Sequence, residues 1–235
     1  MDLGLFKTTS WYPAILDKLF VSTLSVALGA VWLLCKNVAF LEATLSELNV
    51  PVPIDGLSVP IGYLLSALVV TLLFRIFKAH DLISDLFRIR SRFDVNEILL
   101  PLAGEAGLPM PVDKVERMRA KRQDLMRQVF YRYASGVPGA AKIDMEMIVM
   151  ALDQWSWYWM LLEASAIILP CAVFLLVLRR ALPAAWLLVA FVVLLGLMRL
   201  MMPLCIRYAR REVKAIVEDD ARRVEVKQVL TLIRK

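Results

Sequence analysis

Four long blocks of apolar residues constrain this chain more than any other feature of its sequence. They cover residues 13–35, 59–77, 155–178 and about 181–206. A helix needs about 20 apolar residues to cross the ~30 Å hydrocarbon core of a bilayer. Lipid cannot pair open backbone groups, and the blocks lack the polar–apolar alternation of barrel strands. We therefore expect an all-α, polytopic membrane protein with four transmembrane helices in two hairpins.

The overall composition agrees with this expectation and excludes several classes of protein. Apolar residues make up 60% of the chain and the mean hydropathy is +0.64, whereas soluble domains are about 45–50% apolar. Charged residues still account for 21%, so they must be concentrated between the blocks. Three cysteines are too few, and odd in number, for a disulfide framework. A disordered chain, a secreted disulfide scaffold and a typical soluble enzyme are excluded.

The distribution of lysine and arginine predicts the orientation in the membrane. The loop over residues 36–58 has one base and three acids, whereas residues 75–153 contain 13 bases and residues 207–235 contain nine. Basic loops remain in the cytoplasm, so both termini and the middle segment are expected there, in a bacterial inner membrane. No small-x-small cleavage site follows Cys35, so we expect the first block to stay as an anchor. Arg179 and Arg180 oppose this orientation, because it places their turn outside.

The polar part of the sequence lies in two segments, a cytoplasmic insert and an amphipathic C-terminal helix. We expect four parts, residues 1–77, 78–154, 155–206 and 207–235. In the insert, Asp94 and Asp113 are each followed three residues later by glutamate, a pattern typical of capping boxes. These predict a short helix from Asp94 to Gly104 and a longer one from Asp113 to about Tyr133. The tail is expected to continue the fourth span.

A basic face on the longer helix of the insert allows three interpretations. The insert and the tail can form a cytoplasmic helical bundle, dock on anionic lipid headgroups or bind nucleic acid. Acids interrupt the bases and no aromatic residues are interleaved with them, so nucleic acid is not an expected partner. The residues of this face are Lys114, Arg117, Arg119, Lys121 and Arg122.

Ionisable residues inside the spans are candidate functional residues, because such groups are costly in lipid and are usually paired or functional. The second hairpin turns near residue 181, and Glu163 and Arg199 each lie 18 residues from that turn. Asp17 and Arg75 match in the same way in the first hairpin. We therefore predict two intramembrane charge pairs. They either neutralise one another within one subunit, or line an ion pathway or switch between intrasubunit and intersubunit pairing.

Small residues four apart mark possible helix-packing surfaces in the first two spans. Ser25 and Gly29 lie in the first, and Gly62 and Ser66 lie in the second. Such pairs let helix backbones approach closely. They could close the first hairpin on itself or form an oligomer.

No enzymatic motif is present, and we expect no catalytic residue, no metal site and no cofactor. The chain has no phosphate-binding loop, nucleophile elbow, CxxC or paired histidines. Its one histidine, His80, forms a polar helical turn with Asp81 and Asp85. Such a turn is more typical of the membrane–water interface than of a catalytic site.

The sequence predicts a non-enzymatic integral membrane subunit of a larger assembly. Its partners would be membrane lipids and either like copies or a cytosolic protein bound through the cytoplasmic helices. One alternative is an oligomeric pore or membrane-permeabilising effector, for example of a defence system. Another is a transporter component.

Overall fold

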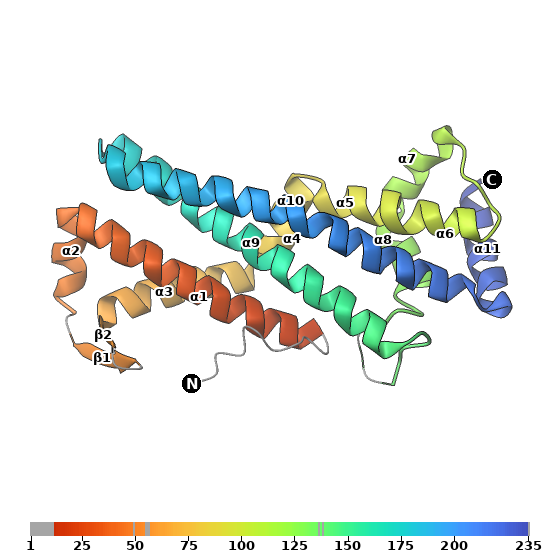
Figure 1. The fold of residues 1–235 in the computed structure, drawn as a ribbon, viewed down its shortest axis with the longest axis horizontal. Coiled ribbons are helices and arrows are strands. Elements are labelled where there is room, and N and C mark those ends of the chain that lie inside the picture. Colours follow the sequence, from red (N-terminus) through yellow and green to blue (C-terminus); the bar gives the residue numbers. More distant parts are fainter. Residues whose placement is uncertain (1–11, 49, 55–56, 136, 138, 235) are drawn as a thin grey trace. The chain divides into compact units, whose positions relative to one another are not determined.

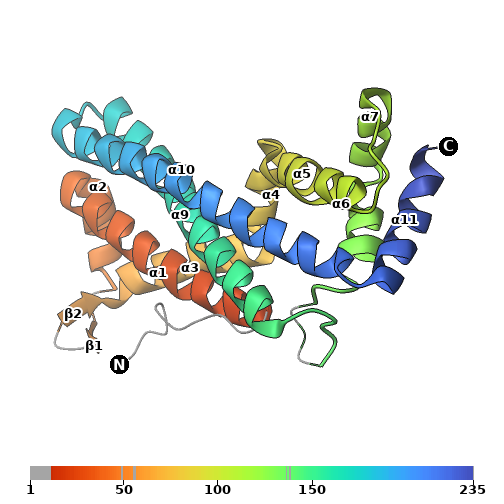
Figure 2. The same ribbon diagram turned by 45° about the vertical axis from the view of Figure 1, so that its right-hand side comes forward.

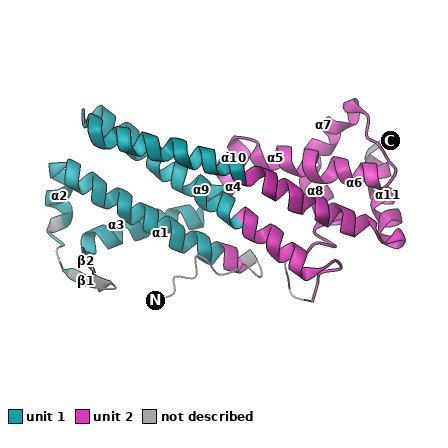
Figure 3. Ribbon diagram, in the orientation of Figure 1, with its two compact units in different colours: residues 1–7, 16–80, 156–200 teal, residues 8–15, 81–155, 201–235 magenta. Residues whose placement is uncertain are grey.

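The computed structural model describes residues 12–48, 50–54, 57–135, 137 and 139–234. The chain divides into two compact units, which are coloured separately in Figure 3. Among the described residues, unit 1 contains 16–80 and 156–200, and unit 2 contains 12–15, 81–155 and 201–234. The two longest helices contribute residues to both units. The predicted first segment, 1–77, begins in residues that lie outside the described part.

Unit 1 is built mainly from helices, which Figure 1 labels. Its elements are α1 (Tyr12–Asn37), α2 (Ala39–Ser46), β1 (Pro51–Ile54), β2 (Leu57–Pro60), α3 (Ile61–Ile76) and parts of α9 (Met145–Val177) and α10 (Ala181–Val217). The strands form one antiparallel hairpin, in which Pro51 pairs with Pro60. The all-α prediction missed this hairpin and α2, since both lie in a connection that was expected to be a loop.

Among the described residues, three helices are long and apolar enough to cross a membrane, namely α1, α9 and α10. The second predicted span is divided: α3 ends at Ile76, and α4 (Ala79–Leu86) follows after a break at which the helix bends by 60°. The chain has a fourth candidate span if this bent pair counts as one. The turn between α9 and α10 lies at residues 178–180, within the region that the apolar blocks indicated.

Alanines of α1 and α3 lie at the centre of one contact between the helices of unit 1. Ala27 and Ala30 of α1 are buried against Ala67 of α3 and Ile167 of α9. Alanine lets helix backbones approach closely, which gains van der Waals contact where lipid supplies no hydrophobic driving force. This small-residue face orients α1 and thereby determines which of its polar side chains point inward.

The predicted packing residues occupy two different environments. Ser25 and Gly29 are exposed on α1, so this pair does not close the first hairpin. Gly62 is buried at the start of α3, where a Cβ atom would lie 2.5 Å from the backbone oxygen of Leu45 in α2. Ser66 donates a hydrogen bond to the carbonyl of Gly62 within α3. The close approach therefore involves α2 and not the facing span.

Gly62→Ala is expected to destabilise unit 1 by about 1–3 kcal/mol, because the added methyl group forces the backbone at Leu45 to move. The matched control is Gly29→Ala, where a Cβ atom has no neighbour within 4 Å. That change should be neutral or stabilise α1, since alanine favours helix by about 1 kcal/mol over glycine. Thermal unfolding of the full chain in lipid nanodiscs checks both. Equal effects of the two changes would contradict the prediction.

Unit 2 is a bundle of short helices (Figure 2). Its elements include most of α4, then α5 (Ile89–Phe93), the π-helical η1 (Asp94–Leu99), α6 (Leu100–Glu105), α7 (Val112–Ala120), α8 (Arg122–Leu125), the π-helical η2 (Met126–Phe130), α11 (Asp220–Arg234) and the ends of α9 and α10. Helix α11 packs against α6, α7 and η2. The tail thus packs on the insert.

Several local predictions for unit 2 are wrong because tertiary contacts override them. The helix predicted from Asp94 to Gly104 is present as η1 and α6, but Asp94 does not cap it: the chain is already helical in α5, and Asp94 is buried beside Arg122. The longer helix begins at Val112 without a side-chain cap and breaks at Lys121. The tail continues the fourth span past Pro203 as predicted, but only to Val217, where α10 ends; α11 is a separate helix that starts at Asp220.

Candidate intramembrane polar site

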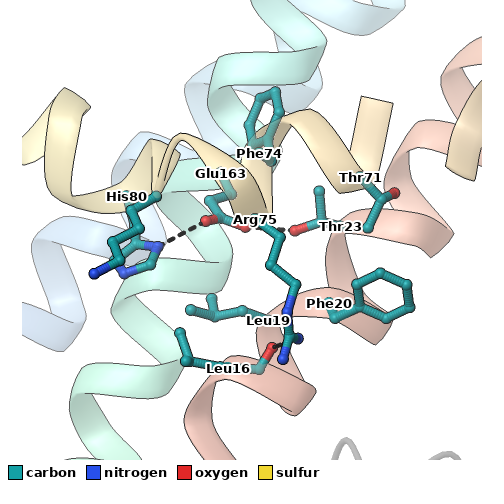
Figure 4. Close-up of a pocket in the computed structure, with 10 residues that line it drawn as sticks. Leu16, Leu19, Phe20, Thr23, Thr71, Phe74, Arg75, His80 and Glu163 are labelled. Atoms are coloured by element: carbon teal, nitrogen blue, oxygen red, sulfur yellow. Dashed lines mark hydrogen bonds and ion pairs between the residues drawn. The ribbon is translucent and has the colours of Figure 1, made fainter. Parts of the chain in front are cut away.

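Three polar side chains from three different helices meet inside unit 1. Thr23 of α1 donates a hydrogen bond of 2.5 Å to Oε2 of Glu163 in α9. Oε1 of the same carboxyl group lies 3.0 Å from Nδ1 of His80, at the start of α4. All three residues are buried, with exposed fractions of 2, 3 and 5%. Figure 4 shows both contacts converging on Glu163.

The local structure of each helix explains why these side chains meet. Thr23 shares the inward face of α1 with Ile15, Leu19 and Ala27, which recur every four residues. Helix α3 ends at Ile76, and Lys78 then adopts the left-handed conformation with a φ of 47°. This left-handed residue permits the 60° bend, and His80 lies in the first turn after it.

A cavity of about 160 Å³ opens beside the carboxyl group of Glu163. Its walls carry apolar residues of α1 and α3, and its polar residues are Thr23, Thr71, Arg75, Lys78, His80 and Glu163. A buried water needs about 10–15 Å³ of space, so the cavity has room for several. Arg75 and Lys78 are exposed and lie where the cavity meets solvent or headgroups.

Asp17 and Arg75, which the first hairpin was expected to bring together, are neighbours in the structure. Nη2 of Arg75 lies 3.4 Å from Oδ1 of Asp17, and Nη1 donates to the carbonyl of Leu16. The side chain of Asp17 is 76% exposed, so the pair is accessible to solvent or headgroups. An exposed pair contributes about 0–1 kcal/mol to stability, but its Arg75 also lines the cavity.

The predicted pair between Glu163 and Arg199 is wrong. Glu163 binds Thr23 and His80 instead, and the side chain of Arg199 is exposed on α10. Equal distance from the turn sets the depth of two residues in a hairpin, but not the direction in which each points. Within the part of the chain that the structure describes, Arg199 forms no ion pair.

Sequence reasoning missed His80 and Thr23 as partners of Glu163. His80 was assigned to a polar turn with Asp81 and Asp85, but these aspartates contact Arg90 and Arg122 in unit 2. The available signal was that His80 is the single histidine of the chain and directly follows an apolar block. Thr23 gave no signal, because threonine is common in apolar helices.

The predicted basic face is not a continuous surface. Arg122 is buried; its Nη1 lies 3.2 Å from Oδ2 of Asp94, and Nη2 lies 3.6 Å from Asp85. Burial raises the pKa of Asp94 to about 6, although Arg122 and Arg90 favour its charged form. Arg117 and Lys121 are exposed, while Lys114 and Arg119 are half-buried beside the acids Asp113 and Glu116.

The polar site has a carboxylate and an imidazole that can accept a proton, and a hydroxyl that donates a hydrogen bond, but not the ligand set of a metal centre. In the described ranges, no three histidine, cysteine, aspartate or glutamate side chains are placed to hold a metal ion.

Comparison with known proteins places the chain in one family. No curated protein and no solved structure matches it. A family model, described as the YmfE protein family, matches residues 11–228, which is nearly the whole sequence. The chain belongs to the YmfE protein family.

Proposed function

We propose that this protein is a non-enzymatic, multi-pass subunit of a larger assembly in a bacterial inner membrane, with four spans and both termini in the cytoplasm. Three long apolar helices and a bent fourth candidate support the membrane location. The basic segments 75–153 and 207–235 support the orientation.

The observation that carries the proposal is the uncovered surface of α10. Only 11% of its most apolar 18-residue window is buried inside the chain, against 44% for α9 and 33% for α1. Trp186, Val192 and Leu200 are more than half exposed on this helix. Other molecules in the membrane must therefore cover most of this apolar window.

The surface of α10 could be covered by lipid alone or by a partner protein, and Arg199 favours the protein. It lies 18 residues after the start of the helix, about 27 Å along the axis and so within the ~30 Å core. Charged residues in spans almost always face other helices and are paired. The acids of this chain's own spans are already engaged, Asp17 with Arg75 and Glu163 with His80. We therefore assign the α10 surface to a different membrane protein that presents a carboxylate at this depth.

The cytoplasmic helices are a weaker candidate for the main interface. Helix α11 packs against α6, α7 and η2, and Val226 and Leu230 are buried. The apolar residues of α11 that could have bound a cytosolic partner are therefore buried largely against other helices of unit 2.

The proposal is tested by extracting the protein, with its surrounding lipid, directly from the native membrane into nanodiscs and determining which proteins accompany it. A complex of defined stoichiometry with a second membrane protein is expected, and Arg199→Gln should abolish it. Arg207→Gln is the matched control, because it changes an exposed arginine on the same helix just after the apolar block of residues 181–206, and it should leave the complex intact.

The other outcomes of this experiment overturn the proposal. A monomer surrounded by lipid would show that Arg199 reaches the headgroups, and a complex of identical chains would assign α10 to a second copy. Ion flux through liposomes that contain only the purified protein would favour the pore or the transporter component.

A further inference from the structure

We propose that Glu163 and His80 together form a proton-binding site inside unit 1, which exchanges protons with water in the adjoining cavity. The inference concerns a site that the assembly through α10 does not use.

The geometry joins the two groups into one titrating unit. Among the described residues, Thr23 donates to Oε2 of Glu163, and Oε1 contacts Nδ1 of His80. An imidazole and a carboxylate in contact are electrically neutral when they hold one proton between them. Addition of a second proton gives a net charge of +1, and loss of the first gives −1. Two groups that interact this closely titrate in two steps that belong to the pair.

The cavity supplies the route for proton exchange. Glu163, His80 and Thr23 line the same space of about 160 Å³ as the exposed Arg75 and Lys78. The space borders the buried carboxyl group and is large enough for water to reach it, while Leu16, Leu19 and Phe20 form an apolar wall. A buried polar group beside a space that holds water can exchange protons without any opening of the helices.

The charges around the pair come from each helix that surrounds it. Helix α1 contributes Asp17 and Lys18, and the ammonium group of Lys18 lies 4.6 Å from the ring of Trp157 in α9. Helix α3 contributes Arg75, and the break after it contributes Lys78. Asp81 follows His80 directly in α4 and binds Arg90. Arg75 is balanced by Asp17.

The single histidine makes the site directly observable. Because His80 is the one histidine of the chain, ¹⁵N-labelled histidine yields the signals of one imidazole without any assignment. An imidazole in water titrates near pH 6.5, which is within the range where a membrane protein can be studied.

The experiment follows the ¹⁵N signals of His80 in the full-length chain between about pH 5 and about pH 9. The protein is purified without a polyhistidine tag and placed in lipid nanodiscs. We expect the imidazole signals to change in two steps. Glu163→Gln should leave one step, because an amide does not titrate. The control is Glu42→Gln in α2, which removes an exposed carboxylate that binds Lys36 of α1. This variant should preserve both steps.

Thr23→Val provides a second variant that retains both titrating groups and nearly the same side-chain shape. It removes the donor to Oε2, so the carboxylate holds its proton more readily. The step at lower pH should move upward by about one pH unit or more. Signals that do not change with pH, a single step in the wild type, or identical titrations in Thr23→Val and the wild type would each overturn the proposal.

Discussion

Arg122→Met is expected to destabilise unit 2 by about 3–5 kcal/mol, because it leaves the carboxylate of Asp94 buried without its ion-pair partner. Nη1 of Arg122 lies 3.2 Å from Asp94, and the two side chains are only 10% and 9% exposed. A methionine fills a similar volume, so loss of the charge accounts for most of the effect. Amide hydrogen exchange of η1 and α8 in the full-length protein measures the free energy of local opening.

Arg119→Met is the matched control for this prediction. Arg119 binds Glu116 one turn away, and the acid is 74% exposed. Exposed pairs of this kind contribute about 0–1 kcal/mol. A loss as large as that of Arg122→Met would show that arginine content, and not the buried pair, stabilises the insert.

The loss caused by Arg122→Met should decrease in acid. Burial raises the pKa of Asp94 in the folded chain to about 6, above the ordinary value of about 3.9. A group whose pKa is raised by folding favours the folded state at low pH, and this contribution is lost as the pH rises through the folded value. At about pH 5 the variant therefore holds Asp94 largely neutral and should recover stability. A loss that is independent of pH would exclude an unpaired carboxylate as its cause.

Leu230→Ala is expected to destabilise the packing of α11 by about 2–5 kcal/mol, the usual effect of truncating a buried leucine. Leu230 is fully buried, and its helix packs against α6, α7 and η2. The amides of α11 should lose protection from exchange, and the hydrogen bond from Tyr133 to Glu225 should be lost with them.

The same substitution two residues later serves as the control for the tail. Leu232 is 74% exposed, so Leu232→Ala should change the stability by no more than about 0.5 kcal/mol. Equal losses of stability in the two variants would mean that the face of α11 that carries Leu230 does not pack against the insert.

The sequence alone determined where the apolar helices lie along the chain. The lengths of the apolar blocks predicted α1, α9 and α10 and the turn near residue 180. The proximity of Asp17 and Arg75 also followed from the sequence, because the positions of two residues along a hairpin depend only on their distances from the turn. These properties depend on local hydrophobicity and on the constant rise of a helix.

The tertiary structure decided the partners of the polar side chains. Depth in the hairpin suggested Arg199 for Glu163, but the rotation of α9 turns the carboxylate toward Thr23 and His80. Burial of Arg122 against Asp94 likewise replaced a predicted cap and an exposed basic face. Rotation about a helix axis and the bend after α3 depend on which small and polar residues of distant segments fit together. No pattern within one helix contains that information, so the polar site and the ion pairs of unit 2 could be found only in the folded chain.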